Sequence, residues 1–595
     1  MEGAASVGSK RALSASSQVR LTPAEAGVLK VLSEAKQFAG RDTTIRVVGG
    51  WVRDKVLGLE SDDIDIALDD MAGAEFAECV QAYLKEQGTE TSRLAVIERN
   101  PEQSKHLETA TMKIEGISID FVGLRAEEYA AGSRIPEVRL GTAEEDALRR
   151  DLTINALFYR VDSGAVEDLT GRGLGDLRAG IARTPLEPMQ TFTDDPLRVL
   201  RSVRFATRFD LQVDGALAEA AASDSVRAAL DSKVSRERLG VEVSKMFEGP
   251  DPVRAAYLLA SLSLWDVVFR MPELELIHRQ EVVRGAMVSS APTLPAEGVG
   301  RAGLHCMLLV HRLSQPAAPT AALAPARRSL LWWSGIFLPC RRLATKFKKA
   351  GTQTVVEYMH RESLKGLPLA DAKQVDLIIN AVEALSGAVR AQAAGEALDR
   401  VAVGLLLCEL KELWRPALLV ACAAEIYAEL GPSLIAAEQA GGAWAEPSAT
   451  QPEPEAGRDP AAESTAARES RAAVLASDAL PPSCTLTLSR RGRPELDFGV
   501  AFTPAHLQLM GSYMEFATHL EAVELHEPWK MKRFFSVRET QAHAHRADVV
   551  LCAADIAGAF GDAGKGGDGS SGLEAGPSCQ GVRLKNPAVG SERRL

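Results

Sequence analysis

Two aspartates separated by a single residue, Asp63 and Asp65, have the residue type and spacing for metal chemistry. In the segment DDIDIAL they alternate with Ile64 and Ile66. Alternate residues of a β-strand point to one face, so the two carboxylates would converge outside while the isoleucines anchor in a core. Such carboxylates repel each other, and a hard divalent cation such as Mg²⁺ relieves the repulsion. The pattern predicts a metal site on Asp63 and Asp65, and the alternative is a solvated acidic strand face.

A turn suited to binding an anion precedes these aspartates. Gly49 and Gly50 follow a β-branched run, and glycines let backbone N–H groups approach a phosphate closely. Arg53 follows within one helical turn and can contact a phosphate through its planar guanidinium. An anion site next to a cation site predicts a metal–nucleotide site, in which the glycines seat a triphosphate and the aspartates hold the metal.

A third acidic residue, Asp120, fits the same design. The segment MKIEGISIDFVGL predicts a strand that places Asp120 on the face opposite Ile119 and Phe121. A neighbouring strand could bring Asp120 beside Asp63 and Asp65, where a third carboxylate can help to activate an attacking hydroxyl. The alternative is an aspartate near a strand end without such a role.

The elements that must position these residues change along the chain. Short apolar runs separated by helical or loop stretches predict a mixed α and β region over 40–185, and helical patterns follow over 186–270 and 271–436. The segment 437–482 is rich in Ala, Glu, Ser and Pro and lacks the apolar residues needed to fold. The remaining expectations are a disordered or targeting extension over 1–39, a tail region over 483–558 and a disordered end over 559–595.

The composition is that of a globular protein with several domains. At 595 residues the chain is too long for one core. No apolar run reaches the roughly 18 residues that a membrane span requires. The eight cysteines form no C-x-x-C pair, which argues against a disulfide framework or a thiolate zinc site and suits a reducing compartment. The formal net charge of −12 would argue against nucleic acid if the charge were evenly spread, and it is not.

Several ordered segments carry a resemblance to a known family. After VVGGWVRDKVLGLESDDIDIAL they read SKHLETATMKIEGISIDFVGLR, GTAEEDALRRDLTINALFY, DLTGRGLGDLRAGIART and DDPLRVLRSVRFATRFDL. Over residues 40–270 the chain resembles the class II tRNA nucleotidyltransferases (CCA-adding enzymes), eukaryotic branch, of the DNA polymerase β-like nucleotidyltransferase superfamily. The resemblance implies an α+β nucleotidyltransferase head with a mixed sheet and helices, followed by a mainly α-helical neck, body and tail.

The resemblance also implies roles for individual residues. Asp63 and Asp65 would be the metal ligands, with Mg²⁺ as the cofactor in a two-metal site. The family's acid-Asp-x-x-Arg motif has Asp194 in this chain, where Glu is more usual. The implied nucleotide-binding residues are Gly49, Gly50, Arg53, Arg149, Arg150, Asp151, Asn155, Asp195, Arg198, Arg201 and Arg204.

Asp195 and Arg198 have the chemistry to read a base. Cytosine and adenine both present an exocyclic amine beside a ring-nitrogen acceptor, which a carboxylate and a guanidinium can bind. Guanine and uracil present a carbonyl beside an N–H, so both contacts would be lost and rejection would be strong. Arg201 and Arg204 extend a basic stripe, either for phosphate contacts or for orienting the pair. The alternatives are a helix cap at Asp195 and a solvated arginine face.

A basic, aromatic-rich segment over 326–350 could bind RNA. It has seven basic residues and no acidic one, with Trp332, Trp333 and Phe337 interleaved, and 526–540 repeats the pattern on a smaller scale. The alternative for 326–350 is an amphipathic helix with its tryptophans in the core.

The resemblance implies template-independent addition of C, C and A to the 3′ end of tRNA from CTP and ATP, with release of pyrophosphate. The expected partners are tRNA and the two nucleotides, with no membrane and no protein partner. The expected location is intracellular, in cytoplasm or nucleus, with mitochondrial or plastid targeting left open. A CC-adding or A-adding enzyme or a poly(A) polymerase of the same family stays open, as does an inactive tRNA-binding protein.

Overall fold

The computed structural model describes residues 19–61, 63–89, 95–97, 109–128, 137–270, 296–316, 318–347, 351–365, 367–439, 486–488, 494–496 and 502–526. The chain divides into two compact units, Met1–Leu398 with Leu406–Thr518, and Asp399–Leu405 with His519–Leu595. Within the first unit we call residues 19–185 the head and 186–270 the neck, and we use the word body for the helices from residue 296 onwards.

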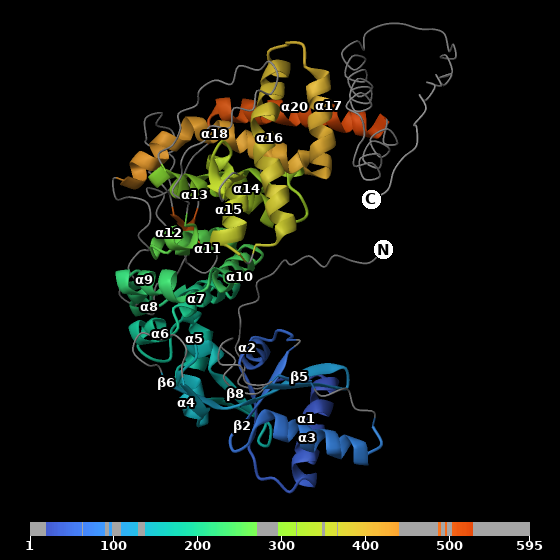
Figure 1. Ribbon diagram of the computed structural model, residues 1–595, viewed down its shortest axis with the longest axis vertical. Coiled ribbons are helices and arrows are strands. Elements are labelled where there is room, and N and C mark those ends of the chain that lie inside the picture. The colour runs from blue at the N-terminus through green and yellow to red at the C-terminus, as the bar shows by residue number, and fades with distance from the viewer. Residues whose placement is uncertain are drawn as a thin grey trace, which may run out of the picture. The chain divides into compact units, whose positions relative to one another are not determined.

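A seven-stranded sheet forms the centre of the head, with the strand order β3-β4-β5-β2-β1-β8-β9 (Figure 1). β2 and β5 run parallel, and the other neighbouring strands run antiparallel. The strands are β1 (Ile45–Val48), β2 (Ile64–Leu68), β3 (Ala95–Ile97), β4 (Thr109–Ile114), β5 (Ile117–Gly123), β8 (Leu157–Arg160) and β9 (Ala165–Asp168). A separate antiparallel pair consists of β6 (Arg125–Glu128) and β7 (Glu137–Leu140).

The head helices pack against this sheet and lead into its loops. α1 (Pro23–Phe38) and α3 (Gly73–Glu86) lie side by side and both contact β5 (Figure 1). The helices that frame the candidate site are α2 (Gly50–Val56), α4 (Ala143–Leu148), the short 3-10 helix η2 (Thr153–Asn155) and α5 (Gly173–Ala179). The first of these follows the Gly-Gly turn, and the second and third flank the Arg149–Asp151 segment.

The expectation that residues 1–39 form a disordered or targeting extension is wrong for 23–38. α1 begins with a capping box in which the Thr22 side chain and the Glu25 side chain each accept the other residue's backbone N–H. Val28, Leu29, Leu32 and Ala35 are buried at helical spacing. The first 18 residues lie outside the part of the chain that the structure describes.

The neck is helical, as expected for 186–270. A two-residue parallel pair, β10 (Ile181–Ala182) and β11 (Gln212–Val213), links the end of the head to the neck. Its helices are α6 (Pro188–Asp194), α7 (Leu197–Arg208), α8 (Gly215–Ala221), α9 (Asp224–Lys233), α10 (Arg236–Phe247), α11 (Pro252–Ser261) and α12 (Trp265–Val268). The predicted order of an α+β head followed by helices is confirmed.

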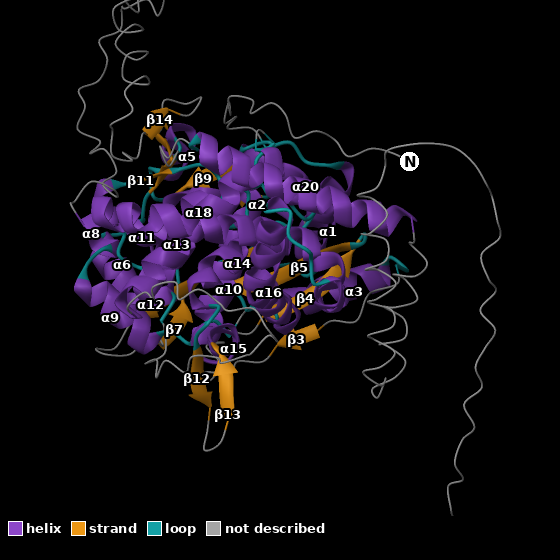
Figure 2. Cartoon of the chain, turned by 90° about the horizontal axis from the view of Figure 1, so that it is seen from above, coloured by secondary structure: helices purple, strands orange, loops and turns teal. Residues whose placement is uncertain are grey.

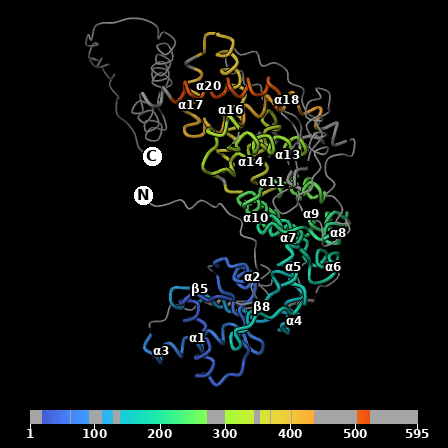
Figure 3. The backbone as a smooth tube through the Cα atoms, turned by 180° about the vertical axis from the view of Figure 1, so that it is seen from behind, coloured from blue at the N-terminus to red at the C-terminus, as the bar shows by residue number. Residues whose placement is uncertain are grey.

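The body is built around four helices that pack together, α13, α14, α16 and α18 (Figures 1 and 3). Figure 2 shows the antiparallel pair that β12 (Ala344–Phe347) and β13 (Gly351–Thr354) form in the body. The helices are α13 (Ala296–Leu313), α14 (Ser329–Phe337), α15 (Val355–Tyr358), α16 (Leu369–Ala393), α17 (Arg400–Leu410), α18 (Trp414–Gln439) and α20 (Pro504–His526). Short elements are η3 (Pro319–Leu323), η4 (Leu338–Cys340), β12 (Ala344–Phe347), β13 (Gly351–Thr354), the π-helix η5 (Met359–Ser363), η6 (Lys411–Leu413), β14 (Leu486–Leu488) and β15 (Pro494–Leu496).

The suggestion that aromatic residues of 326–350 contact RNA is wrong for the residues that carried it. Trp332, Trp333 and Phe337 lie in α14 and are buried, with at most 3% of each exposed. The Trp333 ring packs edge-on against Phe247 of the neck, with 4.9 Å between ring centroids. These rings form part of the core and are not available to stack on bases. The second basic segment, 527–540, lies outside the described residues.

One stretch of the described chain, Ala402–Leu434, is long and apolar enough to cross a membrane by length and composition alone. It comprises most of α17 and α18, and 67% of its most apolar window is buried inside the protein. The expectation from the sequence concerned an uninterrupted apolar run. Ala402–Leu434 passes the length and mean-hydropathy test although charged residues interrupt it. Burial of this kind is the pattern of a core helix.

Candidate active site

The three predicted catalytic carboxylates meet at the parallel pair of strands. Asp65 is the second residue of β2 and lies in register with Asp120 of β5. The isoleucines on either side of Asp65 are buried, so its side chain leaves the sheet on the opposite face. Asp63 precedes the strand and is exposed. The predicted alternation is therefore present, although β2 begins one residue after Asp63.

The environment of Asp65 is that of a carboxylate close to other acids. Burial and the charge of Asp120, with a further contribution from Asp63, raise the pKa of Asp65 to about 6. The guanidinium groups of Arg150 and Arg125 act in the opposite direction. Thr111 donates a hydrogen bond from its hydroxyl to Asp120 Oδ1 at 2.6 Å.

A hard divalent cation fits these oxygen donors. It would relieve the repulsion that holds the pKa of Asp65 high. Within the described residues no group of three His, Cys, Asp or Glu side chains is arranged to enclose a metal ion. Mg²⁺ is usually bound through one or two carboxylates together with water and substrate phosphates. Asp63 and Asp65 therefore suit a metal that takes its remaining ligands from a nucleotide.

The Gly-Gly turn brings the backbone close to the carboxylates. Gly49 has a positive φ of 77° and caps α2. A Cβ at this position would lie 3.2 Å from Arg150 Nη1 and 3.8 Å from Asp65 Oδ2. A larger residue would be strained at this φ and would crowd the Arg150 guanidinium, whereas its contact with Asp65 would be an ordinary one. Glycine at position 49 therefore allows the close approach of Arg150 to the turn.

Arg53 lines the candidate site, and its guanidinium already donates hydrogen bonds within the protein. Only 3% of the residue is exposed, and Nε donates to Asp54 Oδ1 at 2.8 Å. Its Nη1 donates to Asn155 Oδ1 at 2.5 Å. Arg53 therefore ties α2 to η2 within the wall of the site.

A buried aspartate that the sequence interpretation missed organises two predicted arginines. Asp146 of α4 accepts hydrogen bonds from Arg149 Nε at 2.9 Å and from Arg150 Nη2 at 2.8 Å. Burial acts to raise the pKa of Asp146, but the guanidinium groups of Arg150 and Arg149 lower it to about 2. The signal was present in sequence, because an acid three and four residues before two arginines places all three on one helical face.

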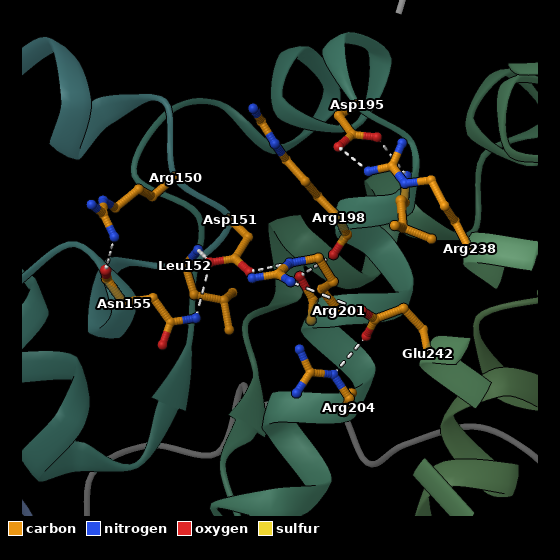
Figure 4. A network of polar contacts seen from close by, with 12 residues as sticks. Arg150, Asp151, Leu152, Asn155, Asp195, Arg198, Arg201, Arg204, Arg238 and Glu242 are labelled. Carbon is orange, nitrogen blue, oxygen red and sulfur yellow. Dashed lines mark hydrogen bonds and ion pairs between the residues drawn. The ribbon is translucent and has the colours of Figure 1, made fainter. Parts of the chain in front are cut away.

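A chain of ion pairs links the head to the neck (Figure 4). Asp151 accepts from Asn155 Nδ2 at 2.9 Å and from Arg201 Nε at 2.7 Å. Glu242 of α10 accepts from Arg204 Nε at 2.5 Å and lies 3.9 Å from Arg201 Nη1. Of the two roles open to Arg201 and Arg204, this arrangement favours orienting the site, since carboxylates already pair with both.

The predicted base-reading residues lie at the start of α7. Asp195 Oδ1 accepts the Leu197 N–H at 3.2 Å, so the suggested capping contact exists, although α7 itself begins at Leu197. Asp195 Oδ2 lies 3.5 Å from Arg238 Nη2, a residue of α10 that the sequence interpretation missed. Arg198 is 8% exposed and is the second residue of α7. Figure 4 shows Arg198 and Asp195 with Arg238 around one part of the site.

These residues enclose one cavity of about 670 Å³. Nine arginines and four aspartates contribute to its wall, which makes it strongly cationic and suited to a polyphosphate. All of the predicted nucleotide-binding residues line it, together with Asp65, whereas Asp63 and Asp120 do not. The lining also contains charged or aromatic residues that were not predicted: Arg125, Asp146, Phe205, Arg208 and Arg238.

Comparison with known proteins gives family matches over two parts of the chain. The family described as "Poly A polymerase head domain" matches residues 45–183. The family described as "Probable RNA and SrmB- binding site of polymerase A" matches residues 228–277. Among solved structures, an apo CCA-adding enzyme aligns with a TM-score of 0.46 and 18% identity over 70% of this chain and 84% of that chain.

Individual relatives match over part of the chain. The mitochondrial CCA tRNA nucleotidyltransferase of Saccharomyces cerevisiae is 50% identical over 230 residues, 38% of this chain and 42% of that protein. A mitochondrial CCA tRNA nucleotidyltransferase of Candida glabrata is 45% identical over 42% of this chain and 49% of that protein. The chain thus spans about half the length of these curated relatives.

A third relative is covered more completely. The CC-adding tRNA nucleotidyltransferase of Deinococcus radiodurans is 31% identical over 304 residues, 50% of this chain and 73% of that protein. The head-domain match over 45–183 includes the sheet, the Gly-Gly turn and those cavity residues that belong to the head. By this coverage, the chain belongs to the tRNA nucleotidyltransferase family.

Proposed function

We propose that this protein adds C, C and A to the 3′ end of tRNA from CTP and ATP, without a template and with release of pyrophosphate. The observation that carries the proposal is a single cavity. Its wall combines Asp65 beside the Gly-Gly turn, an arginine cluster, and the pair Asp195 and Arg198. These are the parts needed for metal-dependent phosphoryl transfer and for base selection by protein side chains.

In the proposed reaction, the 3′-hydroxyl of tRNA attacks the α-phosphate of the nucleotide in line and pyrophosphate leaves. Nucleotidyltransferases of this family use a divalent metal, which we propose is Mg²⁺ on Asp63 and Asp65 in a two-metal site that stabilises the attacking and leaving oxygens. Asp120 lies in register beside Asp65, where its carboxylate can help to activate the 3′-hydroxyl.

The arginines hold the triphosphate in this proposal. Arg150 lies against the Gly-Gly turn, and its guanidinium is fixed by Asp146 and by the Asn155 carbonyl at 3.2 Å. A side chain that is already fixed loses little conformational entropy when it binds a phosphate. Arg201, which is held by Asp151, orients the site in this proposal and does not contact the phosphates.

Base selection rests on Asp195 and Arg198. The carboxylate accepts from the exocyclic amine of cytosine or adenine, and the guanidinium donates to the adjacent ring nitrogen. Guanine and uracil would present a carbonyl and an N–H to these two groups, so both contacts with the base would be lost. CTP and ATP are therefore the proposed substrates.

Recognition of tRNA and location are proposed from the relatives. The match of 228–277 to a probable RNA-binding region supports the neck as part of the tRNA-binding surface, and the body is proposed from its helical resemblance alone. Two relatives are named as mitochondrial, which supports mitochondria as one destination beside cytoplasm or nucleus.

Two narrower activities have specific support. The Deinococcus radiodurans relative is named as a CC-adding enzyme, and the matched head domain is named after poly(A) polymerase. An inactive tRNA-binding protein is the alternative of another class. All of these use the same cavity, so product length distinguishes them.

The test incubates the full chain with Mg²⁺ and a tRNA that ends at the discriminator base. CTP, ATP, both, or GTP with UTP are supplied in separate reactions, and products are resolved at single-nucleotide length. Asp63→Asn runs beside the wild type, and Asp70→Asn is the matched control, because Asp70 is an exposed aspartate just beyond the same strand. We expect C, C and A to be added by wild type and by Asp70→Asn, with a loss of at least about a hundredfold in Asp63→Asn.

Other outcomes would replace the proposal. Products that stop after two C residues would identify a CC-adding enzyme, and long A tracts a poly(A) polymerase. Absence of extension with tRNA binding retained would favour the tRNA-binding protein.

A further inference from the structure

The guanidinium of Arg53 has aromatic rings from another element against its face. Its Cζ lies 4.2 Å from the centroid of the Phe209 ring and 5.2 Å from that of Phe205. Both rings belong to the α7 region of the neck, whereas Arg53 belongs to α2 of the head. Neither phenylalanine was expected to contribute to the site.

The edge and the faces of this guanidinium serve different partners. The edge donates hydrogen bonds to Asp54 and Asn155, both from the head. A guanidinium is planar and weakly hydrated, so its faces can pack on aromatic rings while its edge keeps these bonds. Arg53 is thereby fixed in its orientation by the head and attached to the neck by its face.

The two phenylalanine rings that contact Arg53 are part of a row of aromatic rings and guanidinium groups on α7. Phe205 and Phe209 are four residues apart and project from one side of the helix. Their rings are nearly parallel, with 13° between planes and 6.1 Å between centroids. Arg204 lies 4.2 Å from the Phe205 centroid and Arg208 lies 5.1 Å from that of Phe209. Guanidinium groups and rings thus alternate along this side of α7.

The two helices joined by Arg53 carry different halves of the site. α2 follows the Gly-Gly turn, on the side of the carboxylates and the proposed phosphate site. α7 has Arg198 in its first turn, beside Asp195, on the side proposed to read the base. A contact that fixes one helix against the other also fixes the separation between these halves.

We propose that Phe209, supported by Phe205, is a positioning residue that sets nucleotide preference by holding α7 at a fixed separation from α2 through Arg53. The inference rests on the proposed function. Phe209 is not among the residues that line the cavity, so it acts through Arg53 and not on the nucleotide.

The direction of the effect follows from the sizes of the bases. The reading edge of cytosine lies closer to the ribose than that of adenine, because adenine has a second fused ring. If α7 moves away from α2, Asp195 and Arg198 lose contact with the edge of cytosine before they lose contact with the edge of adenine. Loss of the aromatic contact should therefore weaken use of CTP more than use of ATP.

The experiment uses the full chain and three variants. Phe209→Leu removes the ring and keeps an apolar side chain, and Phe209→Tyr keeps the ring as the conservative rescue. Phe247→Leu is the matched control, because Phe247 is a buried neck phenylalanine whose ring packs on the rings of Phe269 and Trp333. For each protein, kcat and KM are measured for CTP on tRNA lacking CCA and for ATP on tRNA ending in CC. Binding of each nucleotide without tRNA is measured by calorimetry.

We expect Phe209→Leu to lower the ratio of kcat/KM for CTP to that for ATP by about three- to tenfold, mainly through KM. Phe209→Tyr should restore the ratio. Phe247→Leu should lower the thermal midpoint and leave the ratio unchanged. The inference is overturned if Phe209→Leu keeps the wild-type ratio, if Phe209→Tyr does not restore it, or if Phe247→Leu changes it equally.

Failure of the proposed function gives a different result. In that case the wild-type protein would stop after two C residues, add long A tracts, or extend no tRNA. The calorimetric ratio of CTP to ATP binding still tests the role of Phe209, since it needs no reaction. An unchanged binding ratio in Phe209→Leu would count against the positioning role alone.

Discussion

At the scale of single residues, Asp195 has two partners before any nucleotide binds. One carboxylate oxygen accepts the Leu197 N–H, and the other lies 3.5 Å from Arg238. Arg238 approaches from α10, so the side chain of Asp195 is oriented by two elements. A carboxylate held in this way presents a defined acceptor toward the cavity, which is the property that recognition of an exocyclic amine requires.

Replacing Asp195 with Asn should weaken discrimination between bases. An amide keeps one acceptor but adds an NH₂ donor, which can bind the uracil carbonyl in place of the cytosine amine. We expect Asp195→Asn to lower kcat/KM for CTP by about tenfold and to raise incorporation of UMP relative to wild type. Primer extension with single nucleotides measures both.

The control for this change is Asp224→Asn, because the Asp224 side chain is 93% exposed in the same neck. A variant at Asp195 that kept the wild-type preference for CTP over UTP would contradict the base-reading role.

Replacing Asp146 should change how the stability of the head depends on pH. The pKa of Asp146 is lowered from 3.8 to about 2, so the folded protein favours the ionised form. Its stabilising contribution is complete above about pH 4 and is lost as the pH falls toward 2. We expect Asp146→Asn to destabilise the head by about 2 to 4 kcal/mol at neutral pH, because Arg149 and Arg150 lose their buried partner.

The measurement is the difference in thermal midpoint between wild type and Asp146→Asn across pH. That difference should shrink as the pH falls below 4, whereas Glu144→Gln, an exposed change in the same helix, should differ little from wild type throughout. A difference that stayed constant down to low pH would rule out the ion pairs as its source.

At the scale of elements, α1 is an integral part of the head. Glu25 is 4% exposed and accepts from Trp51 Nε1 at 2.9 Å. Lys55 Nζ lies 2.8 Å from the same oxygen. Trp51 and Lys55 belong to α2, the helix after the Gly-Gly turn. α1 therefore supports the element that forms one wall of the candidate site.

Glu25→Gln should loosen α2 without touching the cavity. The substitution leaves Lys55 without its buried counter-charge, and breaking a buried pair costs about 3 kcal/mol. We expect faster hydrogen exchange in α1 and α2 by mass spectrometry, with unchanged exchange in the neck helices as the internal reference.

The matched control is Glu86→Gln, an exposed change at the end of α3. Equal exchange in α2 of the wild type and Glu25→Gln would show that α1 does not hold this helix.

At the scale of the whole molecule, global charge and local charge point in opposite directions. The chain carries a formal net charge of −12, yet nine arginines line the cavity. Charges more than about 10 Å apart are largely screened at physiological ionic strength, so a ligand in the cavity is governed by the nearby arginines. An acidic chain can in this way bind a polyanion.

In the body, the composition of a short segment likewise did not predict what the segment contacts. The basic and aromatic pattern of 326–350 suggested a surface that binds RNA, whereas its tryptophans lie in the core. Basic residues beside them are paired, as Arg341 is with Glu383 at 2.8 Å. Those partners come from α16, more than one helix away in sequence. Composition alone could not reveal that pairing.

The sequence by itself determined the chemistry of the site and the order of the parts. Strand alternation at Asp65 and the glycine at position 49 are local patterns, and backbone geometry links each to one structure. The resemblance supplied the remaining predicted nucleotide-binding residues, and all of them line one cavity. The capping box and apolar spacing of α1 were equally local and could have been recognised.

Only the tertiary structure decided which groups pair. Arg53 and Asn155 are 102 residues apart, and Arg201 and Asp151 are 50 apart. No local periodicity encodes such contacts, because they depend on how elements distant in sequence pack together, within the head for the first pair and between head and neck for the second. The same reason explains why Phe209 was missed: its role depends on a guanidinium from a distant helix. Short-range patterns thus predict the reactive groups, and long-range packing decides what holds each of them in place.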